Sequence, residues 1–202
     1  MATARRRLAI VTGASPSSIG FLAAKALASA PHNFNVVLAC RSPEKGQEAQ
    51  DLIDRDCINA AKFVPLDLSS RHSIREFVEK VRKLPEYTGQ VDLLVNNAGG
   101  SSGFAPVAQL SDEAWQEAAA WILHSAFWAT RAALPHMQAN GFGRIINISS
   151  VEGRQANKEN VSHYITFKHA LNGFTKAVAF ETGVQGITCN AISPGAVETD
   201  LM

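Results

Sequence analysis

Short apolar segments alternate with longer amphipathic segments from one end of the chain to the other. The short segments predict six buried strands, at residues 8–11, 36–39, 63–66, 91–95, 145–148 and 187–192. The longer ones carry apolar residues at helical spacing and predict helices at about residues 19–27, 43–56, 70–81, 111–138 and 162–181. Strands that are apolar throughout and separated by helices are typical of a parallel sheet covered on both faces. We therefore predict one α/β domain over residues 1–202, with Pro65 either in an edge strand or at the end of its strand.

Small polar residues and glycines follow the first predicted strand. Gly13 comes directly after the strand and permits a tight turn, and Ser15 and Ser18 are small enough for the backbone to approach a ligand. The next helix begins near Ile19 and Gly20, so its N-terminal amides point toward the same place. This pattern predicts a site for the pyrophosphate of a dinucleotide. The alternative is an ordinary glycine-rich turn between a strand and a helix.

The residues after the second strand bear on the choice between two dinucleotides. An acidic residue there would bind the adenosine ribose and repel a 2′-phosphate. The chain instead has Cys40 followed by Arg41, whose planar guanidinium pairs well with a phosphate. We therefore expect NADP(H) to be preferred over NAD(H), the alternative being that Arg41 is a surface residue.

Six short motifs, each at the expected end of a strand, together resemble those of the classical short-chain dehydrogenase/reductase family. They are Thr12-Gly13 to Ile19-Gly20, Asp67-Leu68, Asn96-Asn97-Ala98-Gly99, Ser149-Ser150, Tyr164 with Lys168, and Pro194-Gly195 with Thr199. The resemblance implies a Rossmann-type, doubly wound sheet of strand order 3-2-1-4-5-6. It implies an oxidoreductase that moves hydride between NADP(H) and a carbonyl/secondary alcohol pair. It also implies cofactor contacts at Gly13, Ser15, Ser18, Ile19, Gly20, Arg41, Asp67, Leu68, Asn97, Ala98, Gly99, Tyr164, Lys168, Pro194, Gly195, Val197 and Thr199.

Three residues of these motifs carry the catalytic chemistry that the resemblance implies. Tyr164 would donate the proton to a carbonyl oxygen and accept it in the reverse direction. Lys168 lies one helical turn further on, so its ammonium can stabilise the phenolate, and it would also hold the nicotinamide ribose. Ser150 would hydrogen-bond the substrate oxygen. The alternative for Tyr164 is a half-buried structural tyrosine.

Two departures from the family pattern affect the site. The phosphate loop contains an extra residue, Pro16, which has no N–H, and a serine hydroxyl could replace the lost phosphate contact. Ile122 stands where the family has an asparagine that opens a helix for a water in the proton relay. A main-chain carbonyl, Ser125 or His124 could take over that role, and otherwise Ile122 simply packs in the core.

The segment between Ser150 and Tyr164 and the end of the chain also depart from the family. The segment is one residue longer than usual, which makes Glu152 and His163 candidate substrate contacts, with surface positions as the alternative. The family continues beyond the last motif with a substrate-covering loop and a seventh strand, whereas this sequence ends at Met202. We therefore expect a domain truncated before that loop. One stretch of the sequence resembles 3-hydroxybutyrate dehydrogenases and 3-oxoacyl reductases, and another resembles carbonyl reductases. The resemblance therefore does not identify one substrate.

The composition and net charge of the chain limit the kinds of partner that we expect. The chain has 202 residues, 46% of them hydrophobic, and a net charge of +1, which gives no sign of a nucleic-acid or membrane partner. No apolar run approaches the roughly 20 residues that span a bilayer. The three cysteines, Cys40, Cys57 and Cys189, match no metal site and predict reduced thiols in a cytoplasmic protein.

The expected long helix also predicts assembly. The stretch from Ala118 to Trp128 is almost wholly apolar, and a helix that is apolar all round is buried or lies at an interface. We expect a homodimer or homotetramer that acts on a small carbonyl or alcohol. The alternative function is a homologue that binds nucleotide without catalysis and acts through partners.

Overall fold

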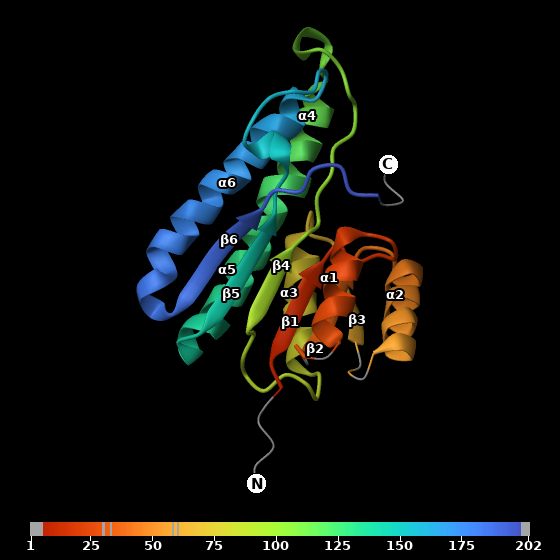
Figure 1. Ribbon diagram of the computed structural model, residues 1–202, viewed down its shortest axis with the longest axis vertical. Coiled ribbons are helices and arrows are strands. Elements are labelled where there is room, and N and C mark those ends of the chain that lie inside the picture. Colours follow the sequence, from red (N-terminus) through yellow and green to blue (C-terminus); the bar gives the residue numbers. More distant parts are fainter. Residues whose placement is uncertain (1–5, 30, 33, 58, 60, 199–202) are drawn as a thin grey trace.

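The computed structural model describes residues 6–29, 31–32, 34–57, 59 and 61–198. Its centre is one sheet of six parallel strands in the order β3-β2-β1-β4-β5-β6, as expected (Figure 1). The strands are β1 Leu8–Thr12, β2 Asn35–Cys40, β3 Ala61–Pro65, β4 Leu93–Asn96, β5 Gly143–Ile148 and β6 Ile187–Ile192. Pro65 ends the edge strand β3, which confirms its predicted position.

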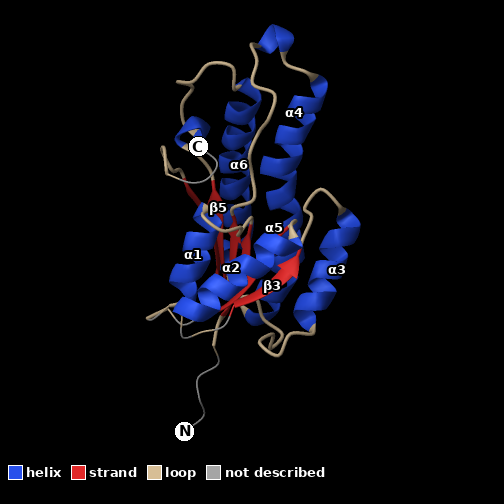
Figure 2. Cartoon of the chain, turned by 90° about the vertical axis from the view of Figure 1, so that its right-hand side faces the viewer, coloured by secondary structure: helices blue, strands red, loops and turns tan. Residues whose placement is uncertain are grey.

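Helices cover both faces of the sheet (Figure 2). They are α1 Ile19–Ala28, α2 Pro43–Asp56, α3 Arg71–Arg82, α4 Asp112–Ala118, α5 Ser125–Asn140 and α6 Ser162–Thr182, with short 3-10 turns η1 Val107–Gln109, η3 Val151–Gly153 and η4 Gly183–Gln185. One core cluster joins one face of the sheet to α3, α5 and α6, and a second joins the other face to α1 and α2. Among the described residues, no helix is long and apolar enough to span a membrane.

Serine side chains set where several helices begin. Ser18, Ser42, Ser70 and Ser111 are the N-cap residues of α1, α2, α3 and α4, and each hydroxyl accepts a backbone N–H from the first turn. The caps on α1, α2 and α3 place the start of each helix directly after a strand, at the carboxyl edge of the sheet.

The predicted long helix is not continuous. Between α4 and α5 the chain forms a π turn, η2, at Ala119–His124. At its end the amide of Ser125 donates to the carbonyl of Ala120, five residues back rather than four. The hydrophobic pattern predicted the helix and its ends but not this widened turn.

Candidate nucleotide-binding and catalytic site

The loop after β1 absorbs its extra residue in a tight turn. The amide of Ser18 donates to the carbonyl of Ser15 at 3.2 Å, which places Pro16 and Ser17 at the centre of a four-residue turn. Ser17 has a φ of 60°, the left-handed conformation that a type II turn needs at its third residue, and proline is favoured at the second. The insertion is therefore accommodated locally, and α1 still begins at the carboxyl edge.

Ser18 shapes this loop. Its hydroxyl accepts the amide of Phe21 at 3.0 Å and lies 2.7 Å from the carbonyl of Ser15 and 3.0 Å from that of Gly13. The side chain is buried and its hydrogen-bonding capacity is used within the loop. A phosphate at this helix end would meet the first-turn amides of Ile19 and Gly20, which a helix does not satisfy internally. The replacement of a phosphate contact by the serine hydroxyl stays a prediction, and these contacts argue against it.

The loop after β4 packs directly onto the loop after β1. The Thr12 hydroxyl accepts the amides of Asn97 at 3.1 Å and Ala98 at 3.0 Å, and the Asn97 side chain donates to the carbonyls of Thr12 and Gly13. Gly13 has a φ of +65°, and a Cβ there would lie 2.9 Å from the Ala98 Cα. The sequence placed Thr12 in a motif without giving it a role, and its structural role is to join these two loops.

These two loops form a cradle that fits the pyrophosphate and nicotinamide side of a dinucleotide. Its floor is glycine and small residues in close backbone contact, and the positive end of α1 points at it. Gly99, at its outer edge, is exposed. The predicted residues Gly13, Ser15, Ser18, Ile19, Gly20, Asn97, Ala98 and Gly99 lie in these two loops or in the first turn of α1.

The ends of β2 and β3 place a cation beside a carboxylate. Asp67 accepts hydrogen bonds from the amide and hydroxyl of Ser69, and the hydroxyl bond, with a smaller contribution from the charge of Arg41, holds the pKa of Asp67 below its usual value. The Arg41 guanidinium carbon lies 5.7 Å from the ring centroid of Trp121. Leu68 instead packs against the core. Sequence reasoning gave Trp121 no role at the site.

Tyr164 and Lys168 lie on one face of α6, one turn apart. The Lys168 ammonium is 5.5 Å from the centre of the Tyr164 ring and donates to the carbonyl of Ile148 at 2.8 Å. Lys168 is 5% exposed, and burial lowers its pKa from 10.5 to about 8. A Cβ at Gly99 would lie 3.6 Å from this ammonium, so Lys168 also borders the loop after β4.

Ser150 follows β5 and is held between α6 and the end of β6. It precedes η3, where its hydroxyl accepts the amide of Glu152 at 3.2 Å. The neighbouring Ser149 donates to the carbonyl of Lys168, and the amide of Val151 donates to the carbonyl of Pro194 at 3.0 Å. The last motif therefore lies beside η3. Gly195 and Val197 are exposed there, and Thr199 lies outside the described residues.

The π turn lies against this catalytic face. Ile122 is 1% exposed and packs in a cluster with Ala118, Ala126 and Leu171, against which Tyr164 also packs. Ser125 and His124 are the two side chains that could substitute for the family asparagine, and they differ in burial. The Ser125 hydroxyl is buried and donates to the carbonyl of Trp121 at 2.6 Å, whereas His124 is exposed. The position where a Cβ would stand on Gly99 is 3.8 Å from that carbonyl.

Glu152 and His163 are both buried, so the surface alternative for them is wrong. The Glu152 carboxylate accepts the amide of Asn157, and Nε2 of His163 donates to the carbonyl of Ser102 at 2.9 Å. The first bond is local to η3 and the segment after it, and the second joins the segment after β4 to the start of α6. A substrate contact by either side chain stays a prediction.

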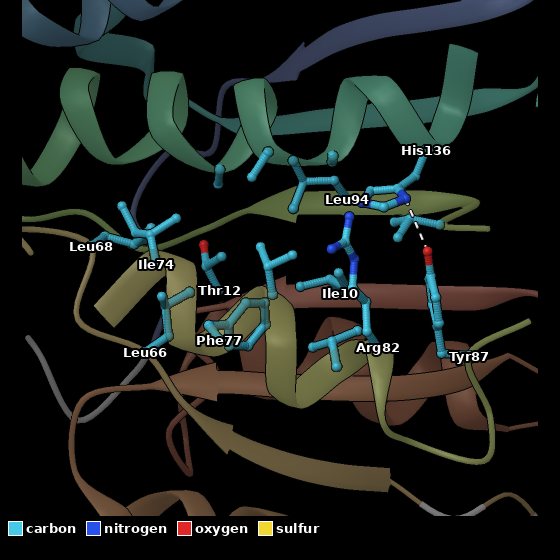
Figure 3. A pocket seen from close by; sticks show the side chains of 16 residues that line it. Ile10, Thr12, Leu66, Leu68, Ile74, Phe77, Arg82, Tyr87, Leu94 and His136 are labelled. Atoms are coloured by element: carbon cyan, nitrogen blue, oxygen red, sulfur yellow. Dashed lines mark hydrogen bonds between the residues drawn. The ribbon is translucent and has the colours of Figure 1, made fainter. Parts of the chain in front are cut away.

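An apolar cavity lies between the sheet and the helices α3 and α5 (Figure 3). Neither Lys168 nor Ser150 lines it. It encloses about 40 Å³, and at one end the Tyr87 hydroxyl is hydrogen-bonded to Nδ1 of His136 at 2.9 Å. Burial, with a smaller contribution from the charge of Arg82, lowers the pKa of His136. The cavity shares only Thr12 and Leu68 with the motifs and is a packing defect of the core. Across the described ranges, no cluster of histidine, cysteine and acidic side chains suits a metal ion.

Known proteins are similar to this chain in sequence and fold. A sequence model described as short chain dehydrogenase matches residues 7–202. The chain is 33% identical to a 3beta-hydroxysteroid dehydrogenase of Mediterraneibacter gnavus over 96% of this chain and 67% of that protein. Among solved structures, a variant of actinorhodin polyketide ketoreductase with NADPH has a TM-score of 0.89 and 36% identity over 100% of this chain and 74% of the other. L-Sorbose reductase from Gluconobacter frateurii, complexed with NADPH and L-sorbose, has a TM-score of 0.87 and 30% identity over 96% and 71%.

Proposed function

The chain belongs to the short-chain dehydrogenase/reductase family of oxidoreductases, and we propose that it transfers hydride between NADP(H) and a ketone, aldehyde or secondary alcohol. The observation that carries this proposal is the buried Lys168 ammonium 5.5 Å from the Tyr164 ring. A cation in that place favours the phenolate form of the tyrosine, so one hydroxyl can give and take a proton. 3-Oxoacyl and 3-hydroxy acid compounds are among the substrates that we propose.

When bound, the nicotinamide supplies or accepts the hydride, and the protein supplies the remaining chemistry. Tyr164 gives its phenolic proton to the carbonyl oxygen as that oxygen gains negative charge. Ser150, at the end of β5, donates a hydrogen bond to the same oxygen and orients it. Lys168 stabilises the phenolate left behind, and its position beside Gly99 also suits a hydrogen bond to the nicotinamide ribose.

The π turn suggests how proton delivery proceeds without the family asparagine. The carbonyl of Trp121 and the ammonium of Lys168 both lie within 4 Å of the position where a Gly99 Cβ would stand, at 3.8 and 3.6 Å. We propose that this carbonyl is the acceptor that faces Lys168, directly or through a water, and that Ser125 positions it. Ile122 then serves only to pack the turn against Tyr164 and Leu171.

Arg41 supports a preference for NADP(H). It follows β2, where the adenosine ribose of a dinucleotide lies in this fold. The residue before it is Cys40 rather than an acidic residue, so no carboxylate there repels a 2′-phosphate. Two structural neighbours, the ketoreductase and L-sorbose reductase, contain NADPH. We extend that cofactor to this chain as part of the proposal, with the predicted residues of the two loops, Arg41 and Asp67 as its contacts.

Assembly and location complete the proposal. Trp115 and Phe127 are large apolar side chains left partly exposed on α4 and α5, which favours a homodimer or homotetramer through this helix. Light scattering at micromolar concentration tests it, since a monomeric mass would contradict it. We also propose a cytoplasmic location, because the three cysteines are free thiols.

Calorimetric titration with NADPH and NADH, followed by 340-nm assays on a panel of ketones and aldehydes, tests the proposed function. We expect saturable NADPH binding and oxidation of NADPH by at least one carbonyl compound. Binding with no turnover of any compound would favour the non-catalytic alternative, and failure to bind either dinucleotide would contradict both.

A further inference from the structure

Trp121 reaches across the carboxyl edge of the sheet from the π turn. Its Cε3 is 3.9 Å from the position where a Cβ would stand on Gly100, and its ring centroid is 5.7 Å from the Arg41 guanidinium carbon. These two neighbours follow β4 and β2, on either side of β1 in the sheet. The indole therefore lies between the residues that follow these two strands and is half-buried there.

The π turn explains why a tryptophan points this way. Neighbouring residues on a helix face about 100° apart, so a turn that buries Ile122 against Leu171 directs residue 121 elsewhere. The other two tryptophans have different partners. Trp115 packs on Phe167 of α6 at 5.0 Å, and Trp128 lies near Arg71 and Arg131 on the outside of α3 and α5.

The groups around Trp121 match one class of ligand. An aromatic face stacks on a purine base, a guanidinium forks onto a phosphomonoester, and a carboxylate acceptor suits an exocyclic amine. Trp121, Arg41 and Asp67 supply these three groups. The Arg41 guanidinium carbon lies 5.7 Å from the Trp121 ring centroid, and Arg41 follows β2 while Asp67 follows the neighbouring strand β3. Their shared complement is an adenosine that carries a 2′-phosphate.

We propose that Trp121 is a specificity-determining residue, whose indole holds the Arg41 guanidinium at the rim of the crevice and packs against the adenine of a 2′-phosphorylated nucleotide. This inference rests on the proposed function, because it assigns a residue to the adenosine end of the NADP(H) site. An arginine held in place loses less conformational freedom on binding a phosphate than one in solvent. The contribution of Trp121 is therefore largest for ligands with the 2′-phosphate.

The test uses ligands that lack nicotinamide, so that binding is measured without turnover. Calorimetry with 2′,5′-ADP and with 5′-ADP compares wild type, Trp121→Leu, Trp121→Phe and the matched control Trp128→Leu, each checked by circular dichroism. We expect Trp121→Leu to weaken 2′,5′-ADP about tenfold, the usual effect of losing one aromatic–base stack, and to weaken 5′-ADP less. Trp121→Phe and Trp128→Leu should bind within about threefold of wild type.

Intrinsic fluorescence gives a second readout if Trp121→Leu folds poorly. Quenching by 2′,5′-ADP should disappear in Trp121→Phe and persist in Trp128→Phe. Unchanged binding by Trp121→Leu, or quenching that survives in Trp121→Phe, would overturn the inference and leave the proposed function intact. The inference about Trp121 would also be overturned if the wild-type protein did not bind 2′,5′-ADP. If that wild-type protein still turned over carbonyl compounds with NADPH, the proposed function would stand.

Discussion

The ammonium of Lys168 lies 5.5 Å from the ring centre of Tyr164, and burial rather than a counter-ion sets its protonation. Its strongest described contact is a neutral acceptor, the carbonyl of Ile148 at 2.8 Å. The protein therefore keeps a desolvated cation beside the proposed proton donor. That arrangement destabilises the fold at neutral pH and supplies the charge that the phenolate needs.

The lowered pKa of Lys168 predicts how stability changes with pH. The unfolded lysine keeps its proton up to 10.5, whereas the folded one loses it near 8, so the burial penalty applies fully below pH 8 and is relieved as the pH rises to 10.5. The difference corresponds to about 3 kcal/mol. In urea unfolding, the free energy of unfolding of wild type relative to Lys168→Met should rise by about 2–3 kcal/mol from pH 7 to pH 10. A constant difference across that range would contradict the pKa assignment.

Replacing Arg41 by alanine should reduce the preference for NADPH. Loss of the guanidinium removes a charge-assisted bond to the 2′-phosphate, so we expect NADPH affinity to fall about 10- to 100-fold and NADH affinity to change less than about twofold. Calorimetry with both dinucleotides measures this, with Arg131→Ala, a distant arginine that lies over Trp128, as the matched control. Equal losses for the two cofactors would place Arg41 outside the phosphate site.

Ser125 should affect turnover more than substrate binding. Ser125→Ala removes the 2.6 Å bond to the Trp121 carbonyl and should lower kcat about fivefold, with little change in KM, because one neutral hydrogen bond contributes about 1 kcal/mol. Ser125→Thr keeps a hydroxyl and should retain most of the rate. Ile122→Asn restores the family residue and should give no gain above about twofold, since the turn is already open. A large gain in Ile122→Asn would show that the π turn does not replace the asparagine.

Ser17 carries local strain that a β-branched residue would increase. It is exposed and left-handed, so Ser17→Val should lower the free energy of unfolding by about 1 kcal/mol, while Ser17→Gly should not lower it. Thermal unfolding of the two variants beside wild type checks this. Equal melting temperatures for the valine and glycine variants would mean that the turn is not held in this conformation.

Periodicity and strand-end chemistry predicted the sheet, the helices and the grouping of the motifs. Each strand was apolar throughout, and parallel topology then placed Gly13, Asn97 and Ser150 at one edge. What periodicity could not predict is how a helix accommodates a local defect. The pattern from 111 to 138 is continuous in hydrophobicity, and the π turn depends on packing of Ile122 against α6, a contact distant in sequence.

Two side chains had roles that motifs did not reveal. Trp121 belongs to no motif, and only the direction imposed by the π turn brings it to Arg41. The sequence allows a serine hydroxyl of this loop to contact a phosphate, yet the Ser18 hydroxyl caps α1 and bonds within the loop. A serine three residues before a helical amide is a capping signal, and this signal predicts the observed role of Ser18.

Hydride transfer by wild type and Tyr164→Phe, followed at 340 nm with NADPH and the same carbonyl compounds, tests the central claim most directly. The variant lacks only the phenolic hydroxyl, so it should still bind NADPH but reduce the best substrate at least about 100-fold more slowly. If both proteins turn over every substrate at equal rates, Tyr164 is not the proton donor.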